Sequence, residues 1–302
     1  MSRAQTSRQS GATRTDPYTT ITAQILADLE RGVIAWTKPW TAGPAVGPVW
    51  RPLRHNLEPY CGINTLVLWS RAVERAYAAP VWMTFRQAQE LGGCVRRGET
   101  GTLVVYANRI TREEESEQGQ TVERSIPFLK AYTVFNVEQI DGLAERFTVA
   151  PQILPEDQRL AGADAFLAAT GAQVVHGGDM ACYELVADRI RLPAFSAFAS
   201  VHDYYATRGH ETVHWTRHPS RLDRDLGRKT FGDEGYAREE LVAELGAAFL
   251  CAELGVDLVP RPDHAAYIGA WLKVLAGDKR AIFTAAAHAQ RAVDYLKALQ
   301  PG

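Results

Sequence analysis

The segment Arg208–Thr216, RGHETVHWT, holds two histidines and a glutamate in the order H-E-x-x-H. Residues four positions apart lie on one face of an α-helix, so His210 and His214 can direct imidazole nitrogens at one ion. Glu211, beside the first histidine, can reach a metal-bound water and take its proton. The pattern predicts a catalytic zinc site on a helix. The alternative is a surface helix that carries two ordinary histidines.

A catalytic zinc normally has three protein ligands, and a later helix offers the third. The segment Tyr236–Leu254 reads as a helix with Glu239, Glu240 and Glu244 among apolar residues, and Glu240 and Glu244 share a face with Tyr236. A carboxylate on a buried face needs a partner, because burial of an unpaired charge is costly. A metal ion would supply that partner.

The composition is that of a soluble globular protein. The chain has 302 residues, of which 46% are hydrophobic and 23% charged, enough for two ordinary domains. No apolar run is long enough to span a membrane, and the polar, basic N-terminus does not resemble a signal peptide. The four cysteines stand apart without C-x-x-C spacing, which indicates reduced thiols in a cytoplasmic protein.

Charge and aromatic residues are concentrated in the first half. Residues 1–110 carry 13 Lys and Arg against 7 Asp and Glu, although the whole chain has a net charge of −2. Five of the seven tryptophans fall within residues 36–82. Cations track phosphates while aromatic rings stack on unpaired bases, so this half suits single-stranded nucleic acid. The alternative is that these tryptophans form the core of a loop-rich domain.

We expect the DNA contacts to come from the basic and aromatic residues of this half. The residues expected to stack on bases are Trp50, Trp69 and Trp82. The residues expected to contact phosphates are Arg51, Arg54, Arg96, Arg97 and Lys130.

The pattern of elements predicts an α+β protein. A basic, disordered tail covers residues 1–15, a DNA-binding α+β domain covers 16–150, and a second, mainly helical domain covers 151–302. In the first domain we expect a helix from Asp16-Pro17, a short helix over Thr84–Leu91, and strands over Leu103–Ala107 and Ile126–Asn136 joined by an acidic hairpin tip. In the second we expect a small antiparallel sheet and helices. The sheet strands are Ala172–His176 and Met180–Val186, the latter extended by Arg189–Leu192. The helices are Gln158–Thr170, Ser200–Trp215, Tyr236–Leu254, Asp263–Leu275 and Asp278–Leu299.

The metal motif resembles that of thermolysin-like zinc peptidases, in which H-E-x-x-H is followed by E-x-x-x-D on a second helix. Glu240–Glu244, ELVAE, is similar to the second pattern, with Glu in place of Asp. The resemblance implies that Glu240 is the third ligand and that Glu244 orients a ligand histidine. Glu239 is the fallback ligand.

A wider resemblance covers nearly the whole chain, from Tyr18 to Leu296. The phrases around His210, Ser220–Arg224, Tyr236–Leu250 and Arg280–Phe283 resemble the metallopeptidase domain of ArdC-type antirestriction proteins. Those over Asn56–Asn64, Trp82–Ala88, Arg97–Thr102 and Leu129–Asn136 resemble the single-stranded-DNA-binding domain of the same proteins, which is related to part of TraC-type plasmid primases.

This resemblance implies a zincin-like fold for the second domain and protection of incoming mobile-element DNA from host restriction. It implies Zn²⁺ as the cofactor, with Mn²⁺ or another divalent metal also possible. The partners would be single-stranded DNA and a peptide or protein substrate. Arg189–Leu192 is expected to be the edge strand on which a peptide lies, and Tyr204, Tyr205, His218 and Tyr236 are candidates for stabilising the oxyanion.

Two other functions stay open. One is a DNA-binding antirestriction protein whose metal site is structural or does not cleave. The other is a metal-dependent nuclease, although nuclease metals usually lie among carboxylates.

Overall fold

The first helix begins at the residue that its sequence predicts. Asp16 accepts a hydrogen bond from the backbone amide of Tyr18 at 3.2 Å, and Pro17 occupies the first turn, where no intrahelical bond is lost. The computed structural model describes residues 16–34, 36, 50–115, 121–147, 155–227, 233–257 and 264–301, and in it this helix, α1, spans Pro17–Glu30. The predicted tail over 1–15 and the predicted boundary at 150 lie outside these residues.

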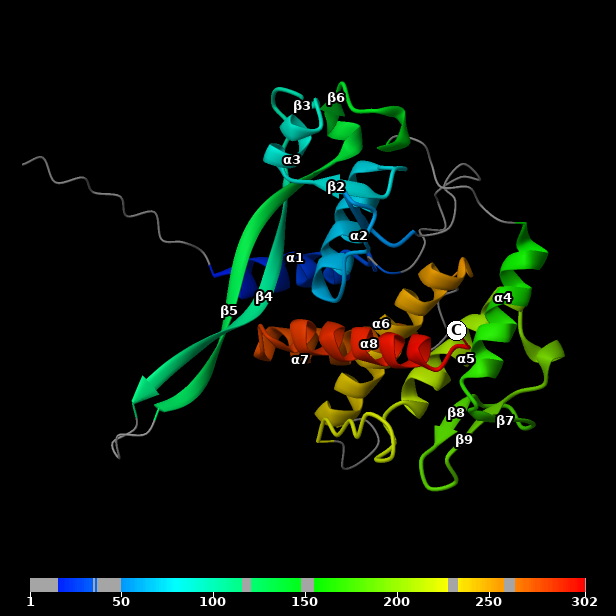
Figure 1. The fold of residues 1–302 in the computed structure, drawn as a ribbon. Helices are drawn as coiled ribbons and strands as arrows, with labels where there is room; N and C mark the ends of the chain where they lie inside the picture. The colour runs from blue at the N-terminus through cyan, green and yellow to red at the C-terminus, as the bar shows by residue number, and fades with distance from the viewer. Residues whose placement is uncertain are drawn as a thin grey trace, which may run out of the picture.

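The N-terminal half is built on a four-stranded sheet with the order β1-β2-β5-β4 (Figure 1). Strands β1 and β2 are parallel, and the other pairs are antiparallel. A separate two-stranded sheet pairs β3 with β6. The elements after α1 are β1 (Leu53–Arg54), α2 (Ile63–Arg75), β2 (Val81–Met83), α3 (Phe85–Glu90), β3 (Cys94–Val95), β4 (Thr102–Glu115), β5 (Thr121–Asn136) and β6 (Ile140–Asp141).

Strands β4 and β5 form a long hairpin that projects from the body of the protein (Figure 1). Their pairing runs from Thr102 opposite Val134 to Glu115 opposite Thr121. The expected strands are therefore present, but both are longer than predicted. The acidic stretch that we expected to form the tip is largely strand, because residues on either side of 116–120 continue the ladder.

The C-terminal half is mainly helical, as predicted. Ser200 caps the helix that carries the histidines, accepting a hydrogen bond from the amide of Asp203 at 3.1 Å. The next helix begins after its cap Asp233 and ends at Gly255, which takes the left-handed conformation with φ of 66°. The elements are α4 (Glu156–Ala169), β7 (Gln173–His176), β8 (Cys182–Glu184), β9 (Arg189–Leu192), α5 (Val201–Trp215), α6 (Glu234–Leu254), α7 (His264–Gly277) and α8 (Ala281–Ala298).

The small sheet of this half differs from the prediction. Its order is β7-β9-β8, with β7 parallel to β9 and β8 antiparallel to it. The expectation of an antiparallel sheet holds for one of its two strand pairs only. Arg189–Leu192 is the central strand, so the expectation that it forms an exposed edge is wrong. Among the residues that the structure describes, β7 and β8 are the outer strands and each pairs with β9 alone.

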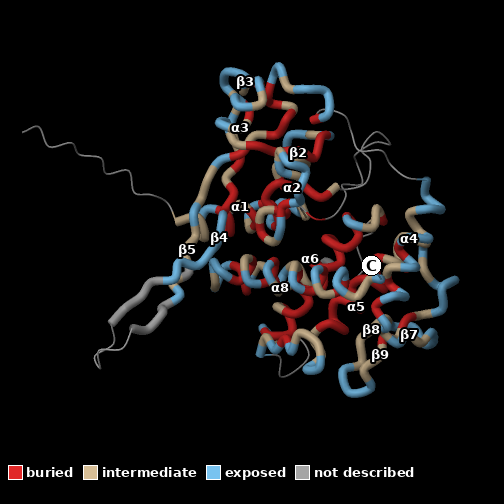
Figure 2. Tube along the Cα trace, viewed as in Figure 1, coloured by how far each residue is buried: buried red, intermediate tan, exposed pale blue. Residues whose placement is uncertain are grey.

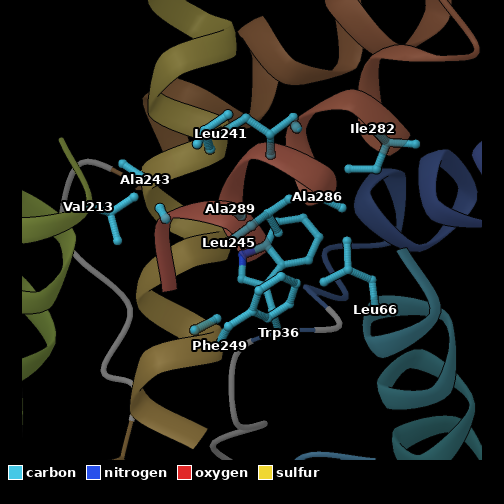
Figure 3. Close-up of a cluster of buried hydrophobic side chains, with 14 of the residues drawn as sticks. Trp36, Leu66, Val213, Leu241, Ala243, Leu245, Phe249, Ile282, Ala286 and Ala289 are labelled. Carbon is cyan, nitrogen blue, oxygen red and sulfur yellow. The ribbon is translucent and has the colours of Figure 1, made fainter. Parts of the chain in front are cut away.

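One hydrophobic core joins the two halves. Ile21 and Ile25 of α1 and Leu66 of α2 belong to the same buried cluster as the apolar residues of α6 and α8. Figure 3 shows Trp36 beside Phe249, with Leu66 and Ala286 to their right in this view. The hydroxyl of Thr22 on α1 also donates to the carbonyl of Lys279, between α7 and α8, at 2.8 Å. The N-terminal half is therefore packed directly on the helices of the metal motif.

Candidate metal centre

Helix α5 buries both histidines of the motif on the side that faces α6. His210 is 3% exposed and His214 is 7% exposed, and their ring centroids lie 4.8 Å apart. Helices α5 and α6 approach closely at Gly246, where an added Cβ would lie 2.8 Å from both methyl groups of Val213. This close approach places the carboxylates of α6 against the two imidazoles.

Glu240 lies where a third ligand is required. Its two oxygens lie 3.5 Å from Nε2 of His210 and 3.5 Å from Nε2 of His214. One ligand atom from each of the three side chains falls within 4.8 Å of the others, and all three residues are buried. Two imidazole nitrogens and a carboxylate oxygen are the donor set of a catalytic zinc site, so these side chains fit a divalent metal.

The remaining nitrogens of the two imidazoles face further carboxylates. Glu244 lies 3.6 Å from Nδ1 of His210, on the nitrogen that faces away from Glu240. Glu239 lies 3.1 Å from Nδ1 of His214. This position places Glu239, the fallback ligand, behind His214, where a carboxylate fixes the tautomer and orientation of a ligand imidazole.

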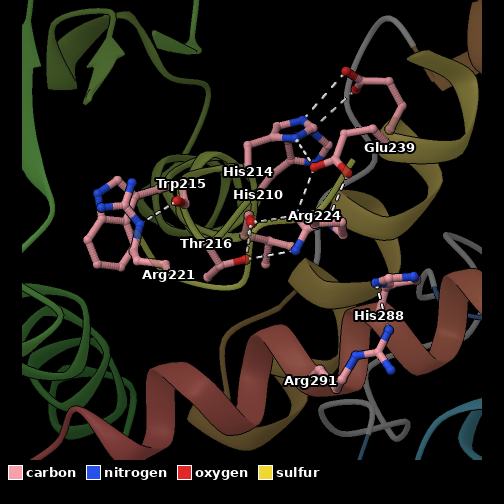
Figure 4. Close-up of polar contacts among 11 residues, drawn as sticks. His210, His214, Trp215, Thr216, Arg221, Arg224, Glu239, His288 and Arg291 are labelled. Carbon is pink, nitrogen blue, oxygen red and sulfur yellow. Dashed lines mark hydrogen bonds and ion pairs between the residues drawn. The ribbon is translucent and has the colours of Figure 1, made fainter. Parts of the chain in front are cut away.

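Arg224 holds Glu239 in that position (Figure 4). Its guanidinium donates from Nε and Nη2 to the two oxygens of Glu239, each at 2.8 Å. It also donates at 3.0 Å to the hydroxyl of Thr216 and to the carbonyl of Val213, at the end of α5. The arginine side chain is 1% exposed, so this bidentate pair is fully removed from water.

The buried charges shift the pKa values of these groups strongly. Burial alone would raise the pKa of Glu239, but Arg224 and His214 outweigh it and lower the pKa to about 2. Burial would lower the pKa of His214, but Glu240 and Glu239 outweigh it and raise the pKa to about 10. Burial likewise opposes ionisation of Glu240, yet the two histidines lower its pKa. The carboxylates of α6 and the cations facing them thus stabilise each other's charged forms, and a divalent ion would take the place of the protons on the histidines.

Glu211 and a tyrosine pair complete the surroundings of the site. Glu211 is 3% exposed, and helix α5, which carries it, packs against strand β8; burial first, and the charge of Glu211 second, raise the pKa of the Cys182 thiol in that strand. The side chain of Tyr236 hydrogen-bonds Glu240, and its hydroxyl lies 2.9 Å from that of Tyr267. Among the four oxyanion candidates, Tyr236 is the one whose described contacts include a predicted metal ligand.

The other three oxyanion candidates have different partners. The hydroxyl of Tyr204 lies 3.1 Å from Nε2 of His176. Tyr205 hydrogen-bonds Asp164 on α4. Nδ1 of His218 lies 2.7 Å from the hydroxyl of Ser220, in the turn after α5.

The structure contradicts three of the predicted DNA contacts. Trp69 is 3% exposed and packs on Phe249 at a centroid distance of 5.7 Å, and Trp82 is 1% exposed, so neither ring offers a face to a base. Arg51 is 6% exposed and donates to the carbonyl of Tyr60 at 2.8 Å and to Gln290 of α8 at 3.0 Å. Trp69 and Arg51 hold the two halves together, whereas Trp82 packs within the N-terminal half.

The other five predicted DNA contacts remain accessible to different degrees. Trp50 is half-buried, and its carbonyl accepts from the indole of Trp69 at 2.7 Å. Arg54, Arg96, Arg97 and Lys130 are exposed. Arg96 pairs with Glu99 at 2.9 Å, and Arg54 lies 3.6 Å from Glu58 and 5.4 Å over the ring of Tyr60.

Sequence reasoning assigned no role to Arg224 and did not place Glu239 behind His214. The phrase Ser220–Arg224 carried part of the family resemblance, but a single arginine fifteen residues before a glutamate has no local periodic signal. Only the turn after α5 brings its guanidinium back to α6.

Two family models match this chain. Residues 15–135 match the family model described as the N-terminal domain of anti-restriction factor ArdC, and residues 161–288 match the model of a zincin-like metallopeptidase. None of the described helices is long and apolar enough to cross a membrane.

Relatives match over most of this chain. The chain is 43% identical to the antirestriction ArdC protein from the R388 plasmid in a metal-free crystal structure, with a TM-score of 0.78 and coverage of 94% of this chain and 97% of that one. The Mn(II)-bound structure of that protein matches with 42% identity, a TM-score of 0.76 and coverage of 94% and 98%.

Two further relatives differ in how much of their own length this chain matches. An uncharacterized protein, y4eC, of Sinorhizobium fredii is 39% identical over 95% of this chain and 94% of its own length. A DNA primase TraC of Escherichia coli is 38% identical over 93% of this chain, but the match spans only 27% of the primase. On the likeness to ArdC and y4eC over nearly their full lengths, the chain belongs to the ArdC-type antirestriction family, with an ArdC N-terminal domain followed by a zincin-like metallopeptidase domain.

Proposed function

We propose that this protein binds single-stranded DNA and hydrolyses a peptide bond at a divalent metal site, and that it protects incoming mobile-element DNA from host restriction. The observation that carries the catalytic half of the proposal is the convergence of His210, His214 and Glu240 beside Glu211. Zinc is the proposed metal, and Mn²⁺ is the principal competitor because a relative is known in a Mn(II)-bound form.

A divalent ion held by His210, His214 and Glu240 would lower the pKa of a bound water and polarise the scissile carbonyl. Glu211 follows the first ligand on α5, so its carboxylate is the group that would take the proton from that water and deliver it to the leaving amine. Its burial beside strand β8 keeps that proton transfer away from bulk solvent.

Tyr236 is the group that we propose to orient Glu240 and to donate to the developing oxyanion. It stands one turn before Glu240 on α6 and hydrogen-bonds it, and Tyr267 supports the phenol from α7. The outer edge of β8 replaces β9 as the proposed docking strand for an extended peptide, since β8 pairs with β9 alone among the described strands and packs against the helix that carries Glu211.

A second function is favoured by one observation. Each of His210, His214, Glu240 and Glu211 is less than a tenth exposed, which is also expected of a metal that stabilises the fold without cleaving anything. In that case the protein would be a DNA-binding antirestriction protein with a structural metal.

Substitution of single site residues in the full-length protein separates the two functions. Glu240→Ala should lower the metal content of the purified protein well below that of wild type. Glu211→Gln should keep the metal but abolish protection of transferred plasmid DNA in a restricting host. Glu234→Gln, at an exposed position on the same helix, is the control and should behave as wild type in both assays.

Two outcomes would contradict the proposal. If Glu211→Gln still binds the metal and gives full protection, catalysis is not required, and the metal has a structural role. Unchanged metal content in Glu240→Ala would remove Glu240 from the ligand set.

A further inference from the structure

We infer that single-stranded DNA binds along one face of the β4–β5 hairpin, close to the body of the protein. This inference rests on the proposed DNA-binding function and names its site. The face, called here the hairpin face, consists of Tyr106, Asn108 and Ile110 of β4 together with Ile126, Phe128, Lys130 and Tyr132 of β5.

The register of the hairpin places these side chains together. Tyr106 lies opposite Lys130, Asn108 opposite Phe128, and Ile110 opposite Ile126. Directly opposed residues of an antiparallel pair point to the same side of the sheet, and so do residues two positions apart on one strand. The seven side chains therefore form one continuous strip of aromatic, apolar, amide and basic groups.

The side chains on this side of the hairpin change from buried to exposed where the hairpin extends beyond the body of the protein. Val104 and Val134, at the base of the same face, are fully buried against Trp82. Two residues further out, Tyr106 is 49% exposed, and Ile110 is also 49% exposed. Figure 2 shows the change from buried to exposed along the two strands. A sheet face with large exposed apolar side chains on a soluble protein is typical of an interaction site.

The rings on the hairpin face are held in place before any ligand binds. Tyr106 and Phe128 contact each other edge to face, with centroids 6.1 Å apart, and the amide of Asn108 donates to the hydroxyl of Tyr106 at 2.6 Å. Tyr132 hydrogen-bonds the buried Tyr60. Rings that are already ordered lose little side-chain entropy when bases stack on them.

Two cations lie near these rings, at the end of the hairpin that joins the body of the protein. Lys130 is exposed and makes no ion pair with any residue that the structure describes. Arg54, whose guanidinium covers the ring of Tyr60, lies near Tyr132. Towards the tip the sequence turns acidic, with Glu113, Glu114, Glu115, Glu117 and Glu123, so phosphates are favoured only along the part of the hairpin nearest the body.

These features fit a single strand better than a duplex or a protein. Bases stack on aromatic side chains only where they are unpaired, and a neighbouring cation neutralises the phosphate that follows each base. A duplex would present phosphates to the cations but no base faces to Tyr106 and Phe128.

The test measures binding of a fluorescein-labelled oligothymidylate of roughly 20 nucleotides by anisotropy with the full-length protein. Tyr106→Ala combined with Phe128→Ala should weaken binding about tenfold or more, whereas Tyr106→Phe, which keeps the ring, should bind as wild type. Lys130→Ala should reduce the slope of log affinity against log salt by about 0.7.

Matched controls come from another exposed aromatic contact in the same half. Phe85 is 49% exposed, like Tyr106, and contacts Phe135 at 6.5 Å, while Arg86 beside it is an exposed cation. Phe85→Ala and Arg86→Ala should leave affinity and salt slope unchanged. Thermal unfolding of each variant checks that its fold is intact.

The outcomes separate failure of the hairpin face as the binding site from failure of the proposed DNA-binding function. No binding by the wild-type protein would overturn the proposed DNA-binding function. Wild-type binding that survives loss of both rings, or that falls equally with Phe85→Ala, would overturn the hairpin face alone. Equal affinity of the wild type for duplex would argue against stacking as the mode of binding.

Discussion

Arg224 shows how one buried side chain selects the role of a neighbouring carboxylate. Glu239 and Glu240 are adjacent on α6, and either has the chemistry of a metal ligand. The bidentate pair with Arg224 holds Glu239 on Nδ1 of His214, which leaves Glu240 to face the two Nε2 atoms. Because the arginine is almost completely buried, loss of its charge would remove two of the hydrogen bonds to the buried Glu239 and leave its charge opposed by His214 alone among the contacts described above.

We therefore expect Arg224→Met to lower the stability by about 3–5 kcal/mol and the metal affinity by about 10–100-fold. Adding Glu239→Gln should recover part of the lost stability, because it removes the buried charge that has lost its arginine partner. Urea unfolding and competition with a metal chelator measure the two effects. Arg221→Met is the control, since Arg221 donates to the carbonyl of Trp215 at 2.7 Å and pairs with Asp188 but contacts no carboxylate of the site. Equal loss of metal affinity in both variants would contradict the role of Arg224.

His288 on α8 supplies a prediction about pH. Burial, and then Arg291 and Arg224, lower the pKa of this imidazole to about 4, below its ordinary value near 6.5. The unfolded chain then binds a proton that the folded protein excludes, so stability should fall as the pH is lowered from about 6.5 to 4. The half-buried position limits the contribution to about 1–2 kcal/mol. His288→Gln should show a smaller decrease in stability over this pH range than wild type, and identical pH profiles would contradict the assignment.

At the scale of elements, the metal centre depends on how closely α5 and α6 pack. Gly246 has no side chain where Val213 fills the interface, and Val213 is fully buried and β-branched, so it has little freedom to move. The same helix pair has a looser glycine at Gly209, where an added Cβ would lie 3.5 Å from Leu250, an ordinary contact.

This difference predicts opposite results for two similar substitutions. Gly246→Ala should destabilise the protein by about 1–3 kcal/mol and weaken metal binding, because α6 must move away from the histidines. Gly209→Ala should be neutral or stabilising by up to about 1 kcal/mol, because alanine favours the helix. Combining Gly246→Ala with Val213→Ala should restore metal binding. Similar melting temperatures and metal affinities for the two single variants would refute this account.

At the scale of the whole molecule, the two halves are joined by packing and by a buried arginine. Arg51 lies 5.1 Å over the ring of Phe249, contacts Gln290 and approaches Glu253 at 3.8 Å. Trp69 packs on the same phenylalanine. The helix that carries Glu240 therefore also carries, further along its length, a contact surface for the N-terminal half.

We expect the protein to unfold in one cooperative transition despite its two family domains. Tryptophan fluorescence, which reports largely on the N-terminal half, and far-ultraviolet circular dichroism, which reports largely on the helices, should give coincident denaturation curves. Phe249→Ala should shift both curves together by about 3–5 kcal/mol. Two separated transitions would show that the halves fold independently.

Much of this protein follows from the sequence alone, because its signals are local. H-E-x-x-H spacing places two histidines on one helix face, and Asp16 and Ser200 cap helices that begin where the sequence predicts. The α+β class, the helices of the second half and the family follow from such patterns. The contacts of Glu240 with both histidines agree with the ligand that the family resemblance implied.

The tertiary structure decided what depends on which surfaces meet. Trp69, Trp82 and Arg51 are residue types that suit a DNA site, yet they are buried. Trp69 and Arg51 are covered where the N-terminal half meets α6 and α8, and Trp82 is covered by α2 and the β4–β5 hairpin, so their burial is set by residues distant in the sequence. Strand order in the small sheet is likewise set by pairing between segments and not by their individual patterns. Both Glu239 behind His214 and the exposed strip on the hairpin arise in the same way, from contacts between residues distant in the chain.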